Sequence, residues 1–144
     1  MVKLWVLLAA VAGLSIAVQA TVNAAGARTL GIPVLVSISG FATGFTGLAF
    51  ALFYIQSTRP EFTGRAVAYG VASGVLGVVI LACVTFAVGQ GGVARALSLV
   101  IAAQLIAGLV LEALGVFGAG AAISPMKVLG VALILLGGIL VVRF

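Results

Sequence analysis

Residues 93–117 read VARALSLVIAAQLIAGLVLEALGVF. This stretch is long enough to cross the hydrocarbon layer of a bilayer, which takes about 20 helical residues. It contains Gln104 and Glu112, and Glu112 is the only acidic residue inside an apolar segment of the chain. At about 100° per residue, Gln104, Gly108 and Glu112 share one face of a helix. Because a carboxylate deep in hydrocarbon costs about 2.5 kcal/mol or more, we expect this face to meet protein or water.

The composition of the whole chain excludes a soluble domain. Of its 144 residues 65% are apolar and 6% are charged, whereas soluble proteins carry about 25% charged residues. The segments long and apolar enough to span a membrane are residues 4–23, 33–55, 66–88, 93–117 and 125–142. We therefore predict an all-α integral membrane protein with five transmembrane helices in a single membrane domain over residues 1–144.

The charged and reactive residues argue against several classes of function. The seven Lys and Arg residues are spread along the chain, so we predict no patch that binds nucleic acid. The sequence has no His, and Cys83 is alone in an apolar segment, so we predict no metal site, no cofactor and no internal disulfide. No nucleophile stands with a base, and we predict no catalytic residues and no enzyme.

A polar stripe marks the first segment, where Ser15, Gln19 and Asn23 recur every four residues and share a helix face. One interpretation is that these side chains hydrogen-bond to neighbouring helices and hold the bundle together. The other is that they line a polar cavity. A third interpretation takes the segment as a cleaved signal peptide, because Lys3 precedes the apolar core and Val18-Gln19-Ala20 fits the small-x-small pattern.

Small residues gather on one face in three of the predicted helices, where another helix can approach closely. They are Gly40, Thr43, Gly44 and Gly47 in the second segment, Gly70, Gly74 and Gly77 in the third, and Gly108 in the fourth. Thr43 is in addition a candidate for the cavity. We expect loops at residues 24–32 and 89–92, and Ser124 and Pro125 are typical of a helix N-cap and first helical residue.

The loop cations are nearly balanced between the two sides of the membrane. With five spans, one side collects Lys3, Arg59, Arg65 and Lys127, and the other collects Arg28, Arg95 and Arg143. A difference of four cations against three hardly favours either orientation in the membrane. We therefore expect the chain to insert in both orientations and two copies to pair antiparallel. The alternative is that Arg59 and Arg65, close together in one polar loop, hold that loop in the cytoplasm.

Three stretches give the chain a family resemblance. They are VQATVNAAGARTLGIPVLVSISGFATG at 18–44, LSLVIAAQLIAGLVLEALGVFG at 97–118 and SPMKVLGVALILLGGILVV at 124–142. With them the chain resembles the YdcZ-like family, five-helix members of the drug/metabolite transporter superfamily. A Gln and an Asn in that family's first helix match Gln19 and Asn23, a Gln in its fourth helix matches Gln104, and an acid near the end of that helix matches Glu112.

The resemblance implies a half-transporter of the bacterial inner (cytoplasmic) membrane. Such proteins form antiparallel dimers with ten helices, either as homodimers or with a homologous paired subunit. The chain is also broadly similar to the small multidrug resistance proteins, which depend on a membrane-embedded Glu in their first helix. Here that helix offers Gln19 and Asn23 and no acid, so a multidrug-type cation exporter remains only an alternative.

These observations favour a secondary transporter that moves a small metabolite by alternating access. We expect Gln19 and Asn23 to bind the substrate or shape its cavity, and Gln104, near the middle of its span, to line it. For Glu112 we expect a coupling or gating role, as proton carrier or as counter-ion to Arg28 or Arg95. The alternative is that Glu112 reaches the membrane interface and pairs with a loop cation.

Two other classes of function stay open. One is a membrane subunit for assembly that transports nothing, whose helices would need packing faces and no polar cavity. The other is an ion channel, which the absence of a ring of acids in the sequence makes less favourable.

Overall fold

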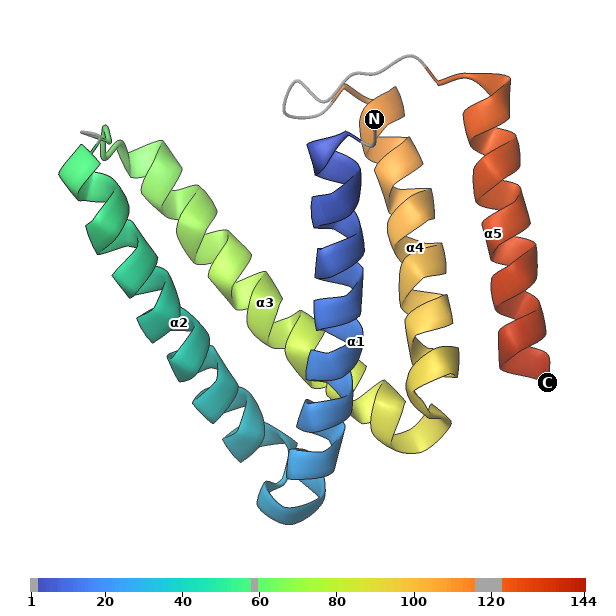
Figure 1. The fold of residues 1–144 in the computed structure, drawn as a ribbon, viewed down its shortest axis with the longest axis horizontal. Helices are drawn as coiled ribbons and strands as arrows, with labels where there is room; N and C mark the ends of the chain where they lie inside the picture. The colour runs from blue at the N-terminus through green and yellow to red at the C-terminus, as the bar shows by residue number, and fades with distance from the viewer. Residues whose placement is uncertain (1–2, 58–59, 116–122) are drawn as a thin grey trace. The chain divides into compact units, whose positions relative to one another are not determined.

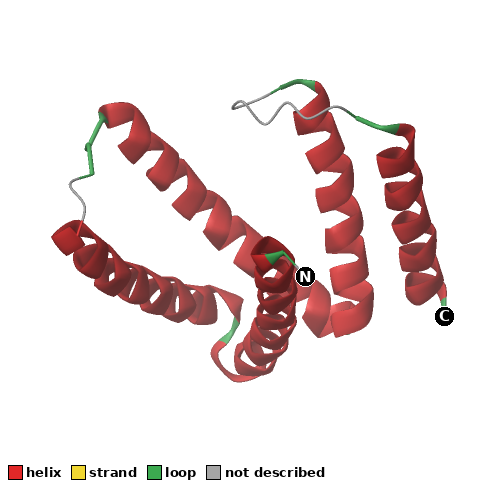
Figure 2. Ribbon diagram, turned by 45° about the horizontal axis from the view of Figure 1, so that its top comes forward, coloured by secondary structure: helices red, strands yellow, loops and turns green. Residues whose placement is uncertain are grey.

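A computed structural model describes residues 3–57, 60–115 and 123–144. The described residues form α1 (Leu4–Leu30), α2 (Ile32–Ser57), α3 (Gly64–Gly91), α4 (Val93–Ala113) and α5 (Pro125–Arg143) (Figure 1). Over these ranges all regular structure is helical (Figure 2). All five helices are long and apolar enough to cross a membrane, with mean hydropathies between 1.7 and 2.5. The prediction of a five-helix membrane protein is confirmed.

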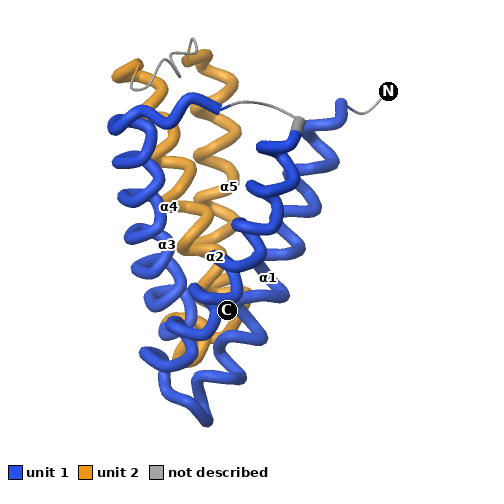
Figure 3. The backbone as a smooth tube through the Cα atoms, turned by 90° about the vertical axis from the view of Figure 1, so that its left-hand side faces the viewer, with its two compact units in different colours: residues 1–86 blue, residues 87–144 orange. Residues whose placement is uncertain are grey.

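The chain divides into two compact units, residues 1–86 and residues 87–144 (Figure 3). The first unit contains α1, α2 and most of α3, and the second contains the end of α3 with α4 and α5. A single membrane domain over residues 1–144 stays a prediction.

In the first unit α1 and α2 form a hairpin with a one-residue connection. That residue, Gly31, has φ 76°, a backbone conformation that glycine adopts without a Cβ clash. Its N–H donates to the Ala27 carbonyl at 2.9 Å and its carbonyl accepts from Leu35 at 3.1 Å. The contact between the helices lies near this turn, where Ala20, Ala24, Leu35 and Val36 are buried, and the helices spread apart beyond it (Figure 1).

Two helices, α1 and α3, end later than the sequence predicts. α1 runs to Leu30, past the predicted end at Asn23, because Ala24, Ala25 and Ala27 favour helix and outweigh Gly26. α3 runs through Gly91, past its predicted end at Val88. The glycines with positive φ in the described residues lie just past helix ends: Gly31 at 76°, Gly92 at 80° and Gly115 at 61°.

In the second unit α4 and α5 pack antiparallel (Figure 1). Early in α4, the backbone oxygen of Ser98 lies 3.7 Å from where a Cβ on Gly138 would be. At the other end of the pair, Lys127 of α5 contacts Glu112 of α4. Ser98 and Glu112 are about 20 Å apart along the helix axis. The two helices therefore stay together over most of α4.

The end of α4 also differs from the prediction, which continued this helix to Phe117. α4 ends at Ala113, and Gly115 follows with φ 61° and donates its N–H to the Glu112 carbonyl at 3.2 Å. A left-handed glycine just after the last turn is a common helix ending. The rest of the predicted segment, residues 116 and 117, lies outside the described residues. Glu112 is therefore in the final turn of its helix.

The start of α5 agrees with the sequence prediction. Ser124 is the N-cap and its Oγ accepts a hydrogen bond from the backbone N–H of Lys127 at 3.2 Å. Pro125 is the first helical residue, where its missing N–H costs nothing. Pro33, in the first turn of α2, follows the same rule.

Candidate functional site

An open groove of about 450 Å³ runs along α1. Its six lining residues form two parallel rows, each with a spacing of four residues. The polar row is Ser15, Gln19 and Asn23, and the apolar row is Leu14, Val18 and Val22. Each row extends over about 12 Å of helix axis. The structure thus brings together the three polar residues that the sequence placed on one face.

The three polar side chains of the groove differ in what they already bind. The Ser15 hydroxyl donates to the carbonyl of Val11 in its own helix at 2.8 Å, so it offers a ligand only its lone pairs. Gln19 is exposed, and its carboxamide can both donate and accept. Asn23 is only 5% exposed. Gln19 is therefore the most available hydrogen-bonding group in the groove.

Asn23 of the groove also hydrogen-bonds to the neighbouring helix α2. Its Oδ1 accepts a hydrogen bond from Ser39 of α2 at 3.3 Å. Its Nδ2 is buried and has no partner in the described part of the chain. A buried donor left unpaired costs about 1–3 kcal/mol. The Nδ2 amide of Asn23 is therefore an unused hydrogen-bond donor beside the groove.

The remaining predicted cavity residues lie elsewhere. Thr43 is exposed on α2, one turn beyond Ser39, and does not line the groove. Gln104 is exposed on α4, and it lies about 120° around the helix from Ser98, which faces α5. Because Gln104 and the groove belong to different units, their meeting in one cavity stays a prediction.

The glycines predicted to pack helices have open space around them. For seven of these positions, a Cβ would meet no atom of the described chain within 4 Å beyond the nearby backbone of its own helix. The seven are Gly40, Gly44, Gly47, Gly70, Gly74, Gly77 and Gly108. The close approaches occur instead at Gly26, which faces Leu35, and at Gly138, which faces Ser98. The predicted packing faces are uncovered in the described chain.

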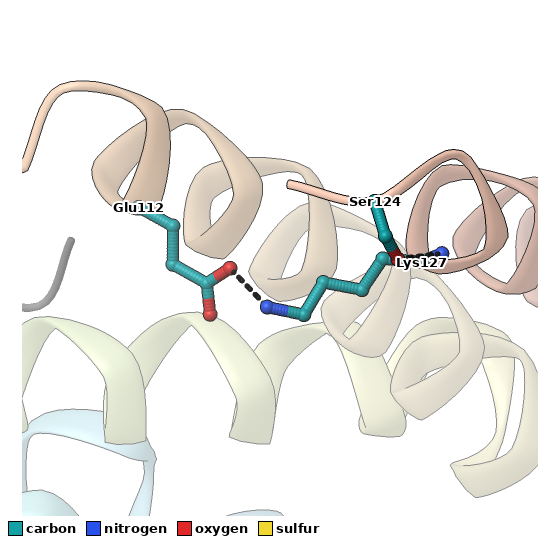
Figure 4. Close-up of polar contacts among 3 residues, drawn as sticks. All are labelled: Glu112, Ser124 and Lys127. Carbon is teal, nitrogen blue, oxygen red and sulfur yellow. Dashed lines mark hydrogen bonds and ion pairs between the residues drawn. The ribbon is translucent and has the colours of Figure 1, made fainter. Parts of the chain in front are cut away.

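Glu112 forms an ion pair with Lys127, whose Nζ lies 2.9 Å from Oε2 (Figure 4). Both side chains are partly exposed, Glu112 at 33% and Lys127 at 42%. The acid is in the last turn of α4 and the lysine is in the first turn of α5, so each opposes the dipole of its own helix. Pairing offsets both unfavourable placements.

This pairing corrects the expected partner of Glu112. From the sequence we expected Arg28 or Arg95. Arg95 is at the opposite end of α4, about 25 Å away along the axis, and Arg28 belongs to the other unit. The lysine contact agrees with the alternative that Glu112 pairs with a cation at the helix end.

Two polar residues that the sequence did not single out have a place in the structure. Ser39 supplies the hydrogen bond to Asn23. Thr85 of α3 is 1% exposed, and its Oγ1 has no partner in the described part of the chain. Neither lies on a recognisable polar stripe. Only the packing of helices reveals them.

Comparison with known proteins identifies the family of the chain. No curated protein and no solved structure matches the chain. The model of the family described as "Putative inner membrane exporter, YdcZ" matches residues 4–140. That match covers α1 to α4 in full and α5 as far as Leu140. The chain belongs to this YdcZ family of the drug/metabolite transporter superfamily, and it is a protein of the inner membrane.

Proposed function

We propose that the protein exports a small metabolite across the inner membrane and that the groove on α1 binds this metabolite. The observation that carries the proposal is the row of Ser15, Gln19 and Asn23 along that groove. The family description supports the outward direction.

The setting of Gln19 explains why this face is a functional one. α1 has a mean hydropathy of 2.0, so it belongs in the hydrocarbon layer. An exposed carboxamide there leaves donors and acceptors unpaired, which is unfavourable in lipid. The polar row is therefore expected to face water, solute or another protein surface. A transporter in which the groove opens in turn to each side meets that requirement.

Gln104 and Thr43 line the same pathway in this proposal, and Glu112 acts at a gate. The ion pair of Glu112 with Lys127 joins one end of α4 to the start of α5. Such a pair is suited to holding one end of the pathway closed. Its position in the last helical turn favours this role over that of a proton carrier at the middle of the membrane.

We further propose that two copies, or this chain and a homologous subunit, assemble antiparallel into a ten-helix transporter. The balanced cations support insertion in both orientations, although Arg59 lies outside the described residues. The uncovered glycine faces of α2 and α3 support close packing against a further helix. A C-terminal reporter active on only one side of the membrane tests this. We expect signal from both sides, and signal from one side alone contradicts dual insertion of this chain.

A metabolite-export assay tests the transport proposal. Cells that express the wild-type chain are compared with cells that express Gln19→Ala, and metabolites in the medium are measured by mass spectrometry. Gln90→Ala is the matched control, because Gln90 is an exposed carboxamide on α3 outside the groove. We expect a small metabolite to accumulate with the wild type and with Gln90→Ala, and not with Gln19→Ala. Equal accumulation with all three chains contradicts the proposal.

The second candidate is a subunit for assembly that transports nothing. The open space around the glycine faces favours it, because such faces are suited to helix packing alone. The two functions separate when Gly44→Leu is compared with Gln19→Ala. An assembly subunit loses its partner with Gly44→Leu and is indifferent to Gln19→Ala, whereas a transporter loses export with Gln19→Ala at unchanged assembly.

A further inference from the structure

We infer that the α1 groove takes an uncharged solute with hydrogen-bonding groups along one side and an apolar surface along the other. This inference rests on the proposed function and names the chemical class of its substrate. It is based on the arrangement of the two rows, the charge of the lining residues and the state of Asn23.

The two rows define the shape of a matching molecule. Ser15, Gln19 and Asn23 follow one another at intervals of about 6 Å along the axis, and Leu14, Val18 and Val22 run beside them at the same interval. A solute lying along the groove meets amides and a hydroxyl on one flank and aliphatic carbon on the other. A metabolite up to about 12 Å long with one polar edge fits this surface.

The groove offers no counter-ion to a charged solute. All six lining side chains are uncharged at any physiological pH, and a charge moved from water to a low-dielectric site is stable only when it is paired. Glu112, the acid of the described membrane helices, is already paired with Lys127 at 2.9 Å. Arg28 follows Asn23 by five residues, which places it about 140° away around α1.

Asn23 adds a donor that the protein itself leaves unused. Asn23 is only 5% exposed, and its Oδ1 accepts a hydrogen bond from the Ser39 hydroxyl at 3.3 Å. Nδ2 has no acceptor in the part of the chain that the structure describes. A carbonyl or hydroxyl oxygen of the solute supplies an acceptor without bringing a charge. Because Nδ2 is covered, we assign first contact to the exposed Gln19 and the second hydrogen bond to Asn23.

Binding of three six-carbon probes with different head groups tests the inference. The full chain in lipid nanodiscs, with ¹⁵N in its side-chain amides, is titrated with hexanamide, hexanoate and hexylammonium at pH 7. Free concentrations are corrected for partition into lipid. We expect saturable shifts of the Gln19 and Asn23 amide signals with hexanamide, at a Kd about three- to tenfold lower than for either ion, which corresponds to about one neutral hydrogen bond.

A charge placed in the groove provides the second measurement. Gln19→Glu is expected to reverse the order, so that hexylammonium binds more tightly than hexanamide at pH 8, because the new carboxylate supplies the missing counter-ion. Gln90→Glu adds the same charge outside the groove and is expected to leave the order unchanged. An unchanged order with Gln19→Glu overturns the assignment of Gln19 as the contact residue.

Three outcomes separate this inference from the proposed function. If either ion binds the wild-type groove as tightly as hexanamide while Gln19→Ala abolishes export, the inference is wrong and the proposed function stands. If hexanamide binds and Gln19→Ala leaves export unchanged, the groove binds uncharged solutes and the transport proposal is wrong. If hexanamide gives no saturable shift, the inference is wrong whatever the export assay shows.

Discussion

The two helix hairpins of this protein differ in how their helices pack and in which polar groups are paired. In α1–α2 the helices touch near Gly31 and then separate, and the polar row beside the contact keeps free hydrogen-bonding groups at Gln19 and Asn23. In α4–α5 the helices stay together from Ser98 to Glu112, and the charge at the end of α4 is paired with Lys127. The first hairpin is therefore suited to binding and the second to holding a fixed geometry.

The difference follows from where small residues lie. Gly26 brings α2 close to α1 only beside the turn, with Leu35 Cδ1 2.9 Å from the position of a Cβ, whereas Gly138 lets α5 approach α4 far from the connection between them. A hairpin closed at one end leaves its outer face available for solute. A hairpin closed along its length fixes the spacing of its helices, and in α4–α5 this places Lys127 beside Glu112.

Alanine at these two glycines gives the largest expected difference. Gly26→Ala forces the buried Leu35 to move, and we expect a net loss of about 1–2 kcal/mol, because overpacking exceeds the gain in helix propensity. Gly138→Ala meets Ser98 at an ordinary 3.7 Å, and we expect a gain of up to about 1 kcal/mol. Unfolding by SDS in mixed micelles measures both. Equal unfolding midpoints for the two variants would show that the packing of α1 against α2 does not depend on the close contact between Gly26 and Leu35.

The hydrogen bond between Ser39 and Asn23 is the next largest contribution that we expect. Ser39→Ala leaves Oδ1 of Asn23 without its donor and should lower stability by about 0.5–1 kcal/mol. Ser37→Ala is the control, because that hydroxyl donates to the Pro33 carbonyl of its own helix and is exposed. The same SDS titration gives both values. An equally large loss of stability with Ser37→Ala would contradict a specific contribution of the hydrogen bond between Ser39 and Asn23.

The ion pair of the second hairpin should contribute least to stability. A double-mutant cycle of Glu112→Gln and Lys127→Met is expected to give a coupling of about 0.2–1 kcal/mol that falls as salt rises, since both groups are partly exposed. In the export assay Glu112→Gln should reduce export less than Gln19→Ala does, because it weakens the proposed gate and leaves the groove intact. Complete loss of export with Glu112→Gln at normal expression would instead assign the coupling carboxylate to Glu112.

The sequence predicts the elements of this fold better than their contacts. Hydropathy alone locates the five helices, and a spacing of four places Ser15, Gln19 and Asn23 on the face that the groove now occupies. The extent of α1 is harder to predict, because Ala24, Ala25 and Ala27 continue a helix past Gly26. Glycine content does not reveal which glycine takes a positive φ.

Contacts between helices depend on geometry that no pattern along one helix contains. Ser39 meets Asn23 because the α1–α2 turn has a single residue. Glu112 meets Lys127 because α4 ends at Ala113 and α5 returns beside it. From the sequence we expected an arginine partner, Arg28 or Arg95, for Glu112. A prediction of these pairs requires the helix ends and the packing of each hairpin.

Water access to α1 tests the central claim most directly. In a Cys83→Ser background, Gln19→Cys places a thiol in the groove, and Thr21→Cys places one at nearly the same depth, about 160° away around the helix from Gln19. Each variant is treated in membrane vesicles with a membrane-impermeant methanethiosulfonate reagent. We expect the thiol of Gln19→Cys to react and that of Thr21→Cys to stay protected. Protection of both, or reaction at Thr21→Cys alone, would contradict a solute pathway along the polar row of α1.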